Sequence, residues 1–388
     1  MKADRRAEVI VVGLGAMGSA TCFQLAARGA AVIGFDRHQP PHPYGSTHGD
    51  TRITRLAIGE GPEYVPLVRR SHVLWREIER ETGAQLLSQS GGLILGHRSN
   101  PFLNQTRAVA RRHELVHENL SNPELVERFP MLRVDEQTEA YYEPEAGYVR
   151  PEAAVRAQLD LARRHRARLR FDEQVKRWAA SADGVTVFTD AGIYAAEHLV
   201  LCAGAWLTQL FPEGSDVFAV HRQLMYWFPI QQGYERLRNL PAFVWDFGGE
   251  KRDFVHFHGF YGLPAIDGPA GGMKVATESY ECTTTPDGGQ HPATKAEIDR
   301  MYERFIGPHL PWLGPRPLRT RSCLYTNTRG SRFVIDRHPD HHSVFIVSAC
   351  SGHGFKHSPA IGEAVAQQLT GQSTGFDLGV FSLARAQR

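Results

Sequence analysis

The sequence contains few cysteines, no long apolar run and no excess of charge of one sign. The five cysteines are far apart and lack the paired spacing of a zinc site: Cys22, Cys202, Cys282, Cys323 and Cys350. This usage fits a reducing compartment best, so we expect a cytoplasmic protein. No run of 18 or more apolar residues is present, so we expect no membrane-spanning helix.

Charge and the amino-terminal residues exclude two further classes of protein. The 44 Lys and Arg residues against 42 Asp and Glu residues leave a formal net charge of +2, too small for the positive field that nucleic-acid binding needs. Arg5 and Arg6 precede an apolar stretch, as in a signal peptide, but Asp4 and Glu8 interrupt the basic region. We therefore expect neither a nucleic-acid partner nor export.

A strand, a glycine-rich turn, a helix and a second strand follow one another near the amino-terminal end. Glu8–Val12 is a β-branched run, typical of a strand buried on both faces of a parallel sheet. It leads into Gly13-Leu14-Gly15-Ala16-Met17-Gly18, a helical segment Ser19–Arg28, and a second run Ala31–Phe35 that ends at Asp36. This order predicts a Rossmann-type dinucleotide-binding unit.

Four residues of this unit have separate tasks. Gly13 permits the tight turn, Gly15 lets the backbone approach a pyrophosphate, and Gly18 lets the helix pack close to the strand. The first turn of the helix offers N–H groups to phosphate, and Asp36 can accept hydrogen bonds from ribose hydroxyls. The pattern alone does not choose between NAD and FAD.

A long polar segment follows Asp36, where a nicotinamide-dependent enzyme would continue with further βα units. It runs from Pro40 to Arg55 without a regular apolar period. We expect this segment to contact a ligand.

The 388 residues suffice for two to three domains of about 150 residues, which we expect to be discontinuous. Apolar spacing and proline positions predict helices over Tyr64–Thr82, Asn104–Glu118, Ser121–Arg128, Pro151–Arg168 and Pro359–Leu369. Alternating and continuous apolar runs predict strands over Gly91–Gly96, Gly184–Thr189, Gly192–Ala196, His198–Trp206 and Phe345–Ser348. The aromatic runs Tyr226–Phe228 and Phe254–His258 predict an antiparallel sheet that forms one wall of a pocket.

Three motifs resemble those of a known enzyme family. The segment Gly45–Arg55, the pair Cys323 and Tyr325, and the segment Ser351-Gly352-His353-Gly354-Phe355-Lys356 are similar, in order and spacing, to the monomeric sarcosine oxidase and N-methyltryptophan oxidase family. The resemblance covers nearly the whole chain. It implies a monomeric FAD-dependent amine oxidase of the D-amino-acid-oxidase-like superfamily, which oxidises a secondary amine on an amino acid to an imine and reduces O₂ to H₂O₂.

The implied fold is α/β: a Rossmann-type FAD-binding domain and a second α+β substrate domain with a largely antiparallel sheet. We expect residues 1–85, 150–216 and 325–388 to form the FAD-binding domain. Residues 86–149 and 217–324 then form the substrate-binding domain.

The resemblance assigns substrate binding to Arg55, Lys356 and Tyr325. Arg55 and Lys356 take the positions at which the family holds the substrate carboxylate. A guanidinium can bind a carboxylate through two hydrogen bonds, and an ammonium adds a point charge. Arg55 bound to a structural carboxylate and an exposed Lys356 are the alternatives, but a cation at the start of a helix is unfavourable unless an anion joins it.

Cys323 matches the cysteine that carries a thioether to the flavin in this family. Its neighbour Arg321 could favour the thiolate, and Tyr325 follows two residues later, as in the family. We therefore expect covalent FAD.

The resemblance assigns four residues to catalysis. Lys274 matches the lysine that activates O₂, where a fixed positive charge stabilises the superoxide first formed. His48 and Arg52 are expected along the flavin ring, where positive charge favours the reduced, anionic form. Tyr261 is expected beside the substrate.

The expected cofactor-binding residues come from both ends of the chain: Gly13, Gly15, Gly18, Asp36, Ser46, Thr47, Val175, Ala203, Gly204, Cys323, Gly352, His353, Gly354, Phe355 and Lys356. One position departs from the family pattern. Glu278 stands four residues after Lys274, where sarcosine-oxidising relatives carry histidine. A carboxylate there would attract a second cation or repel the substrate carboxylate, so the amine itself stays open.

Several alternatives remain at this point. The substrate could be a cyclic amino acid of the pipecolate or proline type, or a glycated amino acid. The chain could also be an NAD-dependent dehydrogenase or a flavin-bearing binding subunit. A metal enzyme is disfavoured, because the His256 and His258 pair lacks a third ligand and the run His338, Asp340, His341 and His342 lies in a proline-containing loop.

Overall fold

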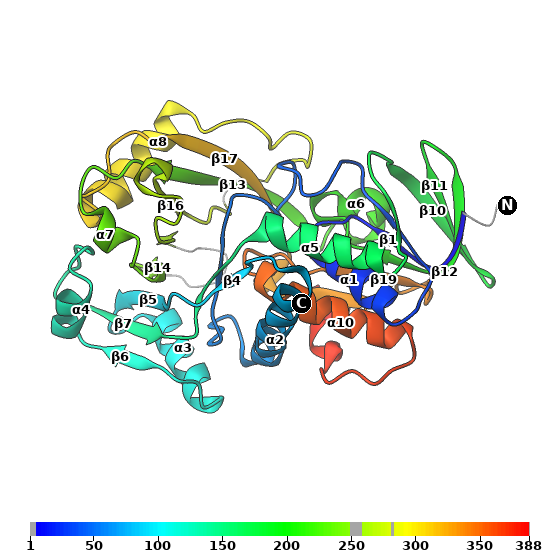
Figure 1. Ribbon diagram of the computed structural model, residues 1–388, viewed down its shortest axis with the longest axis horizontal. Coiled ribbons are helices and arrows are strands. Elements are labelled where there is room, and N and C mark those ends of the chain that lie inside the picture. Colours follow the sequence, from blue (N-terminus) through cyan, green and yellow to red (C-terminus); the bar gives the residue numbers. More distant parts are fainter. Residues whose placement is uncertain (1–4, 249–257, 281–282, 388) are drawn as a thin grey trace.

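The computed structural model describes residues 5–248, 258–280 and 283–387, in which two large sheets are joined by a small one (Figure 1). The first sheet has the strand order β10-β11-β12-β1-β2-β9, and β19 adds to β12 and pairs with β18. Its strands are β1 (Arg6–Val12), β2 (Val32–Phe35), β9 (Arg168–Arg170), β10 (Val175–Ser181), β11 (Gly184–Thr189), β12 (Ile193–Leu201), β18 (Val334–Arg337) and β19 (Val344–Ser348).

The expected βαβ unit forms the centre of this sheet. β1 pairs in parallel with β2 on one side and β12 on the other, and all four residues of β2 are buried. Between β1 and β2 the chain forms α1 (Ala16–Ala27), which packs against α5 (Pro151–Arg164) and α10 (Ser358–Leu369) (Figure 1). Apolar side chains fill both faces of the strands, as parallel sheets require.

The second sheet is antiparallel except where β14 pairs in parallel with β5. Its strand order is β17-β13-β16-β15-β14-β5-β7-β6. The strands are β5 (Gly92–His97), β6 (Glu118–Leu120), β7 (Thr138–Glu143), β13 (Ala219–Phe228), β14 (Ala242–Asp246), β15 (Gly259–Gly262), β16 (Met273–Ala276) and β17 (Arg319–Asn327). The predicted α/β fold with a largely antiparallel second sheet is confirmed.

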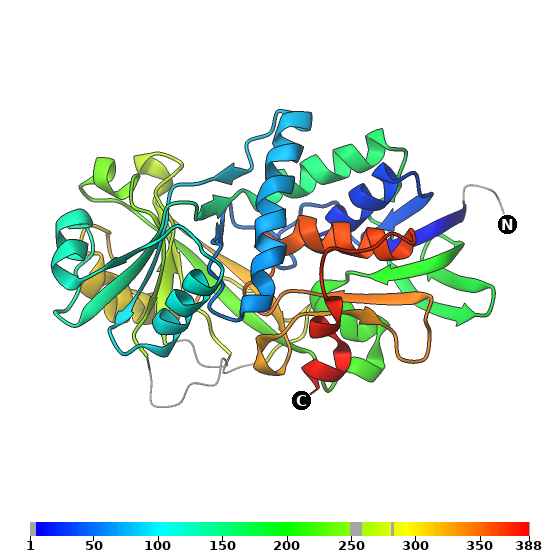
Figure 2. The ribbon, with the colours of Figure 1, turned by 90° about the horizontal axis from the view of Figure 1, so that it is seen from below.

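Further elements join and cover the two sheets. A three-stranded sheet contains β3 (Arg52–Thr54), β8 (Gly147–Val149) and β4 (Leu87–Ser88). The long helix α2 (Val65–Thr82) crosses the middle of the molecule, light blue in Figure 2. The remaining α-helices are all shorter than α2: α3 (Pro101–Arg112), α4 (Asn122–Arg128), α6 (Leu207–Leu210), α7 (Tyr234–Leu237), α8 (Lys295–Met301), α9 (Gly307–His309) and α11 (Leu383–Ala386).

Two predicted helices and two predicted strands differ from the structure. The helix expected over 104–118 is α3, which starts at Pro101 because Asn100 caps it by accepting a hydrogen bond from the Leu103 amide at 3.0 Å. The helix expected to reach Arg168 ends at Arg164, because Arg168–Arg170 pairs with β2 as β9. The two strands expected over 192–206 are one continuous strand, β12, that ends at Leu201.

Two expectations about chain segments were not tested. The aromatic run 254–258 lies outside the described residues except for its last member. The domain division stays a prediction, and β17 runs across the boundary placed at residue 324.

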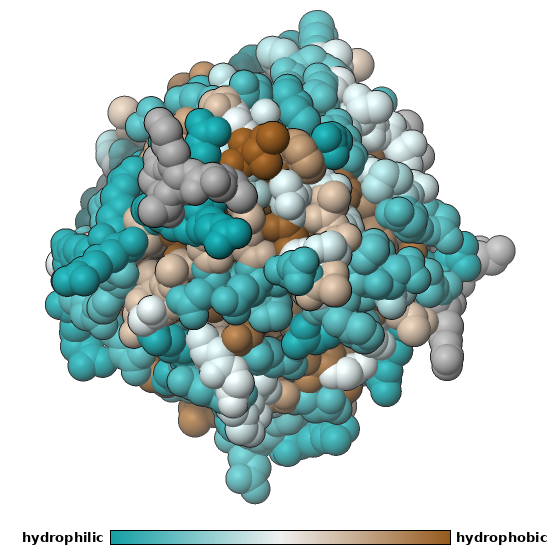
Figure 3. All heavy atoms as spheres, turned by 90° about the vertical axis from the view of Figure 1, so that its right-hand side faces the viewer, coloured by the Kyte–Doolittle hydropathy of each residue, from teal (hydrophilic) through white to brown (hydrophobic). Residues whose placement is uncertain are grey.

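The face of the molecule seen in Figure 3 is mainly hydrophilic. Figure 3 shows teal residues over most of one end of the molecule, with apolar residues singly or in small groups. Among the described helices, none combines the length and hydropathy that a membrane span requires.

Candidate active site

One large cavity lies between the first and second sheets. Its lining includes Gly13, Gly15 and Asp36 and, from other segments of the chain, the two cations Arg55 and Lys356. The carboxyl ends of β1 and β2 open into it, which is where parallel α/β sheets bind their ligands. The cavity therefore combines a dinucleotide-type turn with a cationic end.

The glycine turn leaves bare backbone towards the cavity. Gly13 has a φ of 87°, which favours glycine, and a Cβ on Gly18 would lie 1.7 Å from the Gly13 carbonyl oxygen. A Cβ on Gly15 would reach to 3.3 Å from Thr47 Oγ1, so a side chain there would occupy the cavity end of α1. The glycines thus fit the close approach of a pyrophosphate to the amino-terminal end of the helix.

Asp36 is fixed by backbone hydrogen bonds directly after the end of β2, at the edge of the cavity. Its Oδ2 accepts a hydrogen bond from the Leu14 amide at 2.8 Å, and its Oδ1 accepts one from the His38 amide at 2.9 Å. The carboxylate is buried yet borders the cavity. These residues fit the adenosine diphosphate part of a dinucleotide.

The polar segment expected to contact a ligand lies along the cavity. Ser46, Thr47 and Arg52 are among its lining residues. Arg52 Nη2 donates to the Ser46 carbonyl at 2.7 Å, and the Ser46 hydroxyl donates to the Leu324 carbonyl, so the segment is fixed to β17 of the second sheet. The other expected lining residues found there are Val175, Ala203, Gly204, Gly352, His353, Gly354 and Phe355.

Arg55 and Lys356 both line the cavity and lie close enough to interact electrostatically. Arg55 Nη2 forms hydrogen bonds of 2.8 and 2.7 Å with both oxygens of Glu60, and its Nη1 donates to the Ala57 carbonyl at 2.6 Å. Lys356 is buried, and its Nζ donates to the His353 carbonyl at 2.6 Å. The alternative of an exposed Lys356 is therefore wrong, whereas Arg55 does have a carboxylate partner within the protein.

The charges at this end change one another's pKa. Burial and the neighbouring Arg55 lower the pKa of Lys356 to about 7. Burial raises the pKa of Glu60, but Arg55, His353 and Lys356 together outweigh it and lower the value to about 2. Sequence reasoning missed Glu60, although an acid between Gly59 and Gly61, five residues after Arg55, was a visible signal.

Tyrosines and a carboxylate form the wall next to the cations. Tyr261, Tyr280, Tyr325 and Glu278 line the cavity, and Glu278 Oε2 accepts a hydrogen bond from the Tyr280 hydroxyl at 2.7 Å. Burial raises the pKa of Glu278 to about 7 and that of Tyr261 to about 12. Tyr280 was not predicted.

Alternation along β13 decides which aromatic residues face the cavity side. Met225 and Trp227 pack with Cys323 and Tyr325, while Tyr226 and Phe228 pack in the core on the other face of the sheet. The prediction that this sheet walls the pocket therefore holds for β14, β15 and β17, which contribute lining residues, but Tyr226 and Phe228 point away.

Cys323 lies on β17 and is not among the residues that line the cavity. It is 1% exposed, and its Sγ is 3.6 Å from Arg52 Nη2. Burial raises the pKa of the thiol above its usual value, and Arg52 offsets this only in part. The expectation that Arg321 favours the thiolate is wrong, because Arg321 is exposed and donates to the Thr320 carbonyl. A second thiol, Cys350, does line the cavity, with its Sγ 4.0 Å from Ser46 Oγ.

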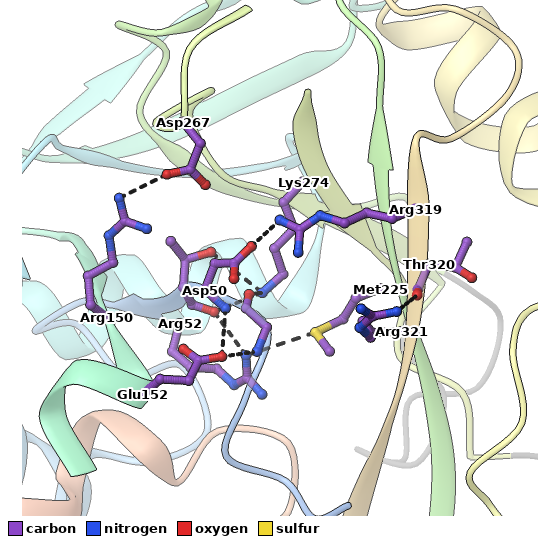
Figure 4. Close-up of polar contacts among 12 residues, drawn as sticks. Asp50, Arg52, Arg150, Glu152, Met225, Asp267, Lys274, Arg319, Thr320 and Arg321 are labelled. Carbon is purple, nitrogen blue, oxygen red and sulfur yellow. Dashed lines mark hydrogen bonds and ion pairs between the residues drawn. The ribbon is translucent and has the colours of Figure 1, made fainter. Parts of the chain in front are cut away.

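Lys274 is bonded to the polar segment 40–55 that runs along the cavity (Figure 4). Its Nζ donates to the carbonyls of Gly49 at 2.7 Å and Thr51 at 2.8 Å and lies 5.6 Å from the centre of the Trp227 ring. Burial and Arg52 lower the pKa of Lys274 well below its usual value, and Cys323, Asp50 and Glu152 offset this only in part. Like Cys323, it is buried and not among the lining residues.

Acidic residues hold this segment from both sides. Glu152, in the first turn of α5, accepts hydrogen bonds from the amides of Gly49 at 2.6 Å and Asp50 at 3.1 Å. The Asp50 carboxylate forms an ion pair with Arg319 of β17, as Figure 4 shows. The Gly49 and Thr51 carbonyls are thereby held in position for the Lys274 ammonium.

His48 does not match its expected role. It is buried behind the lining, and its Nε2 has no hydrogen-bond partner among the described residues. Burial, Arg52 and Lys274 lower its pKa to about 3, so the ring is neutral at neutral pH. Arg52 therefore supplies positive charge at the cavity, and His48 does not.

The histidines considered as metal ligands take other positions. His338 and His341 pack against Trp178, with ring centroids 5.5 and 5.4 Å away. No group of three or more potential ligands is arranged around a metal position within the described part of the chain, which leaves out His256.

A glycine turn on a parallel sheet and a tyrosine-lined cationic end on a second sheet, opening on one cavity, define a two-domain dinucleotide-dependent oxidoreductase. The chain belongs to the family of FAD-dependent oxidoreductases, whose model, described as "FAD dependent oxidoreductase", matches residues 8–368. It is thus an FAD-dependent amine oxidase, and FAD rather than NAD is its cofactor.

Its relatives agree with this class. The chain is 40% identical to monomeric sarcosine oxidase of Streptomyces avermitilis over 97% of both chains. It is 31% identical to N-methyl-L-tryptophan oxidase of Salmonella typhimurium over 97% of this chain and 98% of the relative. Among solved structures it resembles NikD, an amino acid oxidase of nikkomycin biosynthesis, with a TM-score of 0.84, 25% identity and 97% coverage of both chains.

Proposed function

We propose that this chain oxidises secondary amines on amino acids of the N-methyl type and uses O₂ as the electron acceptor, releasing H₂O₂. The observation that carries the proposal is that Arg55 and Lys356 line the same cavity as the glycine turn. When bound, FAD supplies the chemistry by accepting a hydride from the carbon next to the amine. The residues of the chain bind, orient and shield the substrate.

The substrate carboxylate is the group that the cationic end recognises. Lys356 offers an ammonium whose only hydrogen-bond acceptor within the described residues is a carbonyl, and Arg55 offers a guanidinium that it shares with Glu60. Charge-assisted hydrogen bonds from both would fix the carboxylate and thereby orient the amine along the cavity. Tyr261 and Tyr325 border the same end and restrict water there.

We further propose that Cys323 binds FAD covalently and that Lys274 promotes the reaction with O₂. The contact between the Cys323 thiol and Arg52 supports the first role, because a nearby guanidinium favours the thiolate. The fixed ammonium of Lys274 supports the second, because it can stabilise negative charge that develops on oxygen. We propose a monomer that acts in the cytoplasm.

A peroxide-release screen of the purified holoenzyme tests the activity. N-methyl, cyclic and glycated amino acids are compared with the corresponding amines that lack a carboxylate. We expect peroxide from N-methyl amino acids and little from the decarboxylated amines. Peroxide from cyclic or glycated amino acids alone would replace the proposed substrate class.

A further inference from the structure

We propose that Glu278 forms a subsite for a second cation, so that the preferred substrates are amino acids whose side chain carries an ammonium group. This inference rests on the proposed function, because it places the second cation in a cavity that already binds an amino acid by its carboxylate. The subsite consists of the Glu278 carboxylate and the rings of Tyr280 and Tyr325.

The hydrogen bonds of Glu278 leave one oxygen available to a ligand. Oε2 accepts from the Tyr280 hydroxyl at 2.7 Å, and Oε1 has no hydrogen-bond partner among the described residues. A Cβ on Gly352 would lie 3.2 Å from Oε1 and 2.9 Å from the Tyr280 hydroxyl, so the glycine keeps the space beside both groups open. A donor that enters the cavity can therefore reach the carboxylate.

The charges around Glu278 favour a cation as that donor. Glu60 is neutralised by its two hydrogen bonds with Arg55, whereas no ion pair within the described residues involves Glu278 or Lys356. A carboxylate-bearing substrate uses the cations at this end and leaves Glu278 without a counter-charge. An ammonium on the side chain restores the balance, and the tyrosine rings add a surface that attracts organic cations.

The reacting amine itself is a poor partner for this carboxylate. Hydride loss needs the neutral amine, and a carboxylate next to the amine would stabilise its protonated form. A second amine on the side chain can stay charged throughout. The subsite therefore discriminates between substrates with and without a side-chain cation.

Matched substrates test this discrimination in the holoenzyme. Nα-methyl derivatives of 2,4-diaminobutyrate, ornithine and lysine are each compared with the Nα-methyl amino acid of the same carbon chain without the terminal amine. We expect the wild type to prefer the cationic member by about ten- to a hundredfold in kcat/KM for at least one chain length. Glu278→Gln should remove the preference, and Glu278→His should reverse it in favour of the neutral member.

Two controls separate the subsite from a structural effect. Glu145→Gln changes an exposed acid outside the cavity and should keep the wild-type preference. Calorimetric titration with ω-amino fatty acids and the corresponding fatty acids of four to six carbons measures binding without oxidation, and the same preference should appear and disappear with Glu278.

The outcomes are distinguishable. If the wild type had the same kcat/KM for both members of every pair, the subsite would be overturned. The same holds if Glu278→Gln lowered kcat/KM equally for both members of each pair. Absence of peroxide from every N-methyl amino acid, with the calorimetric preference intact, would overturn the proposed function and keep the subsite.

Discussion

The surroundings of Lys356 bring the pKa of its ammonium group close to neutral pH. It is buried beside Arg55, and together these conditions lower its pKa to about 7. A buried ammonium without a carboxylate partner is costly, so an anionic ligand should bind best where Lys356 is still protonated. The carboxylate clamp is therefore expected to depend on pH.

Loss of either cation should weaken binding of amino-acid substrates. We expect Arg55→Ala and Lys356→Ala each to raise KM by roughly 10- to 150-fold, the value of a charge-assisted hydrogen bond. For amines without a carboxylate, KM should be the same in each variant as in the wild type. Unchanged KM in both variants would move the carboxylate site elsewhere in the cavity.

The pH profile provides an independent measurement of the same clamp. Lys356 carries its proton below about pH 7 and loses it above, so kcat/KM of the wild type should fall relative to Lys356→Arg as pH rises through 7. Arginine stays charged over this range. Taking the ratio of the two enzymes cancels titration of the substrate amine, and a flat ratio would contradict the assignment.

Two thiols compete for covalent attachment of FAD, and mutation separates them. Cys323 faces Arg52, while Cys350 lines the cavity near Ser46. We expect Cys323→Ser to release its flavin into the supernatant on acid precipitation, whereas Cys350→Ser keeps the yellow colour in the pellet. The reverse result would identify Cys350 as the attachment site.

Lys274 should affect one half of the catalytic cycle more than the other. Lys274→Met keeps side-chain length and removes the charge, so the reaction of the reduced enzyme with O₂ should slow by several orders of magnitude. Anaerobic reduction by substrate should fall far less, as stopped-flow absorbance can measure. Arg321→Met removes an exposed cation from the same region of the second sheet, where its side chain donates to the Thr320 carbonyl, and is the control. Equal losses in both half-reactions would make Lys274 a structural residue.

At the scale of elements, the close packing of α1 against the end of β1 depends on glycines, which have no side chain. The Cβ of Gly18→Ala would lie 1.7 Å from the Gly13 carbonyl oxygen, so helix and strand must separate. We expect a loss of about 1–3 kcal/mol in the free energy of unfolding, measured in urea, together with reduced FAD content. Gly375→Ala, with no atom within 4 Å of its added Cβ, is the control and should change neither.

Local sequence signals predicted the turn between β1 and α1 and the polar segment 40–55. Strand, glycines, helix and Asp36 are adjacent in the chain, so their spacing alone defines the turn. The motifs at both ends of the chain likewise led to the cavity residues Arg55 and Lys356. Signals of this kind need only neighbouring residues.

Contacts between distant segments could not be predicted in the same way. Arg321 is the sequence neighbour of Cys323, but strand alternation and the segment that crosses β17 place Arg52 against the thiol instead. The pKa of His48 depends on burial and on Lys274, 226 positions later in the chain (274 − 48). Tertiary packing determines the charge states of these groups, and the amino-acid composition gives no information about that packing.

At the scale of the whole molecule, both sheets contribute to one site. The glycine turn belongs to the first sheet, and Tyr261 and Tyr325 belong to the second. The segment containing Asp50 is bonded to α5 on one side and to β17 on the other. The relative position of the two sheets therefore sets the distance between the dinucleotide end and the carboxylate end.

The strand order of the first sheet also determines what happens while the chain is being made. β1 emerges with β2 as its first partner, but its other neighbour, β12, begins only at Ile193, and β19 begins at Val344. At about 5–20 residues per second, β1 waits roughly ten to forty seconds for β12. During that time an apolar strand edge is open to other nascent chains. Rapid overproduction should therefore yield inclusion bodies, and slower translation at low temperature should yield folded enzyme.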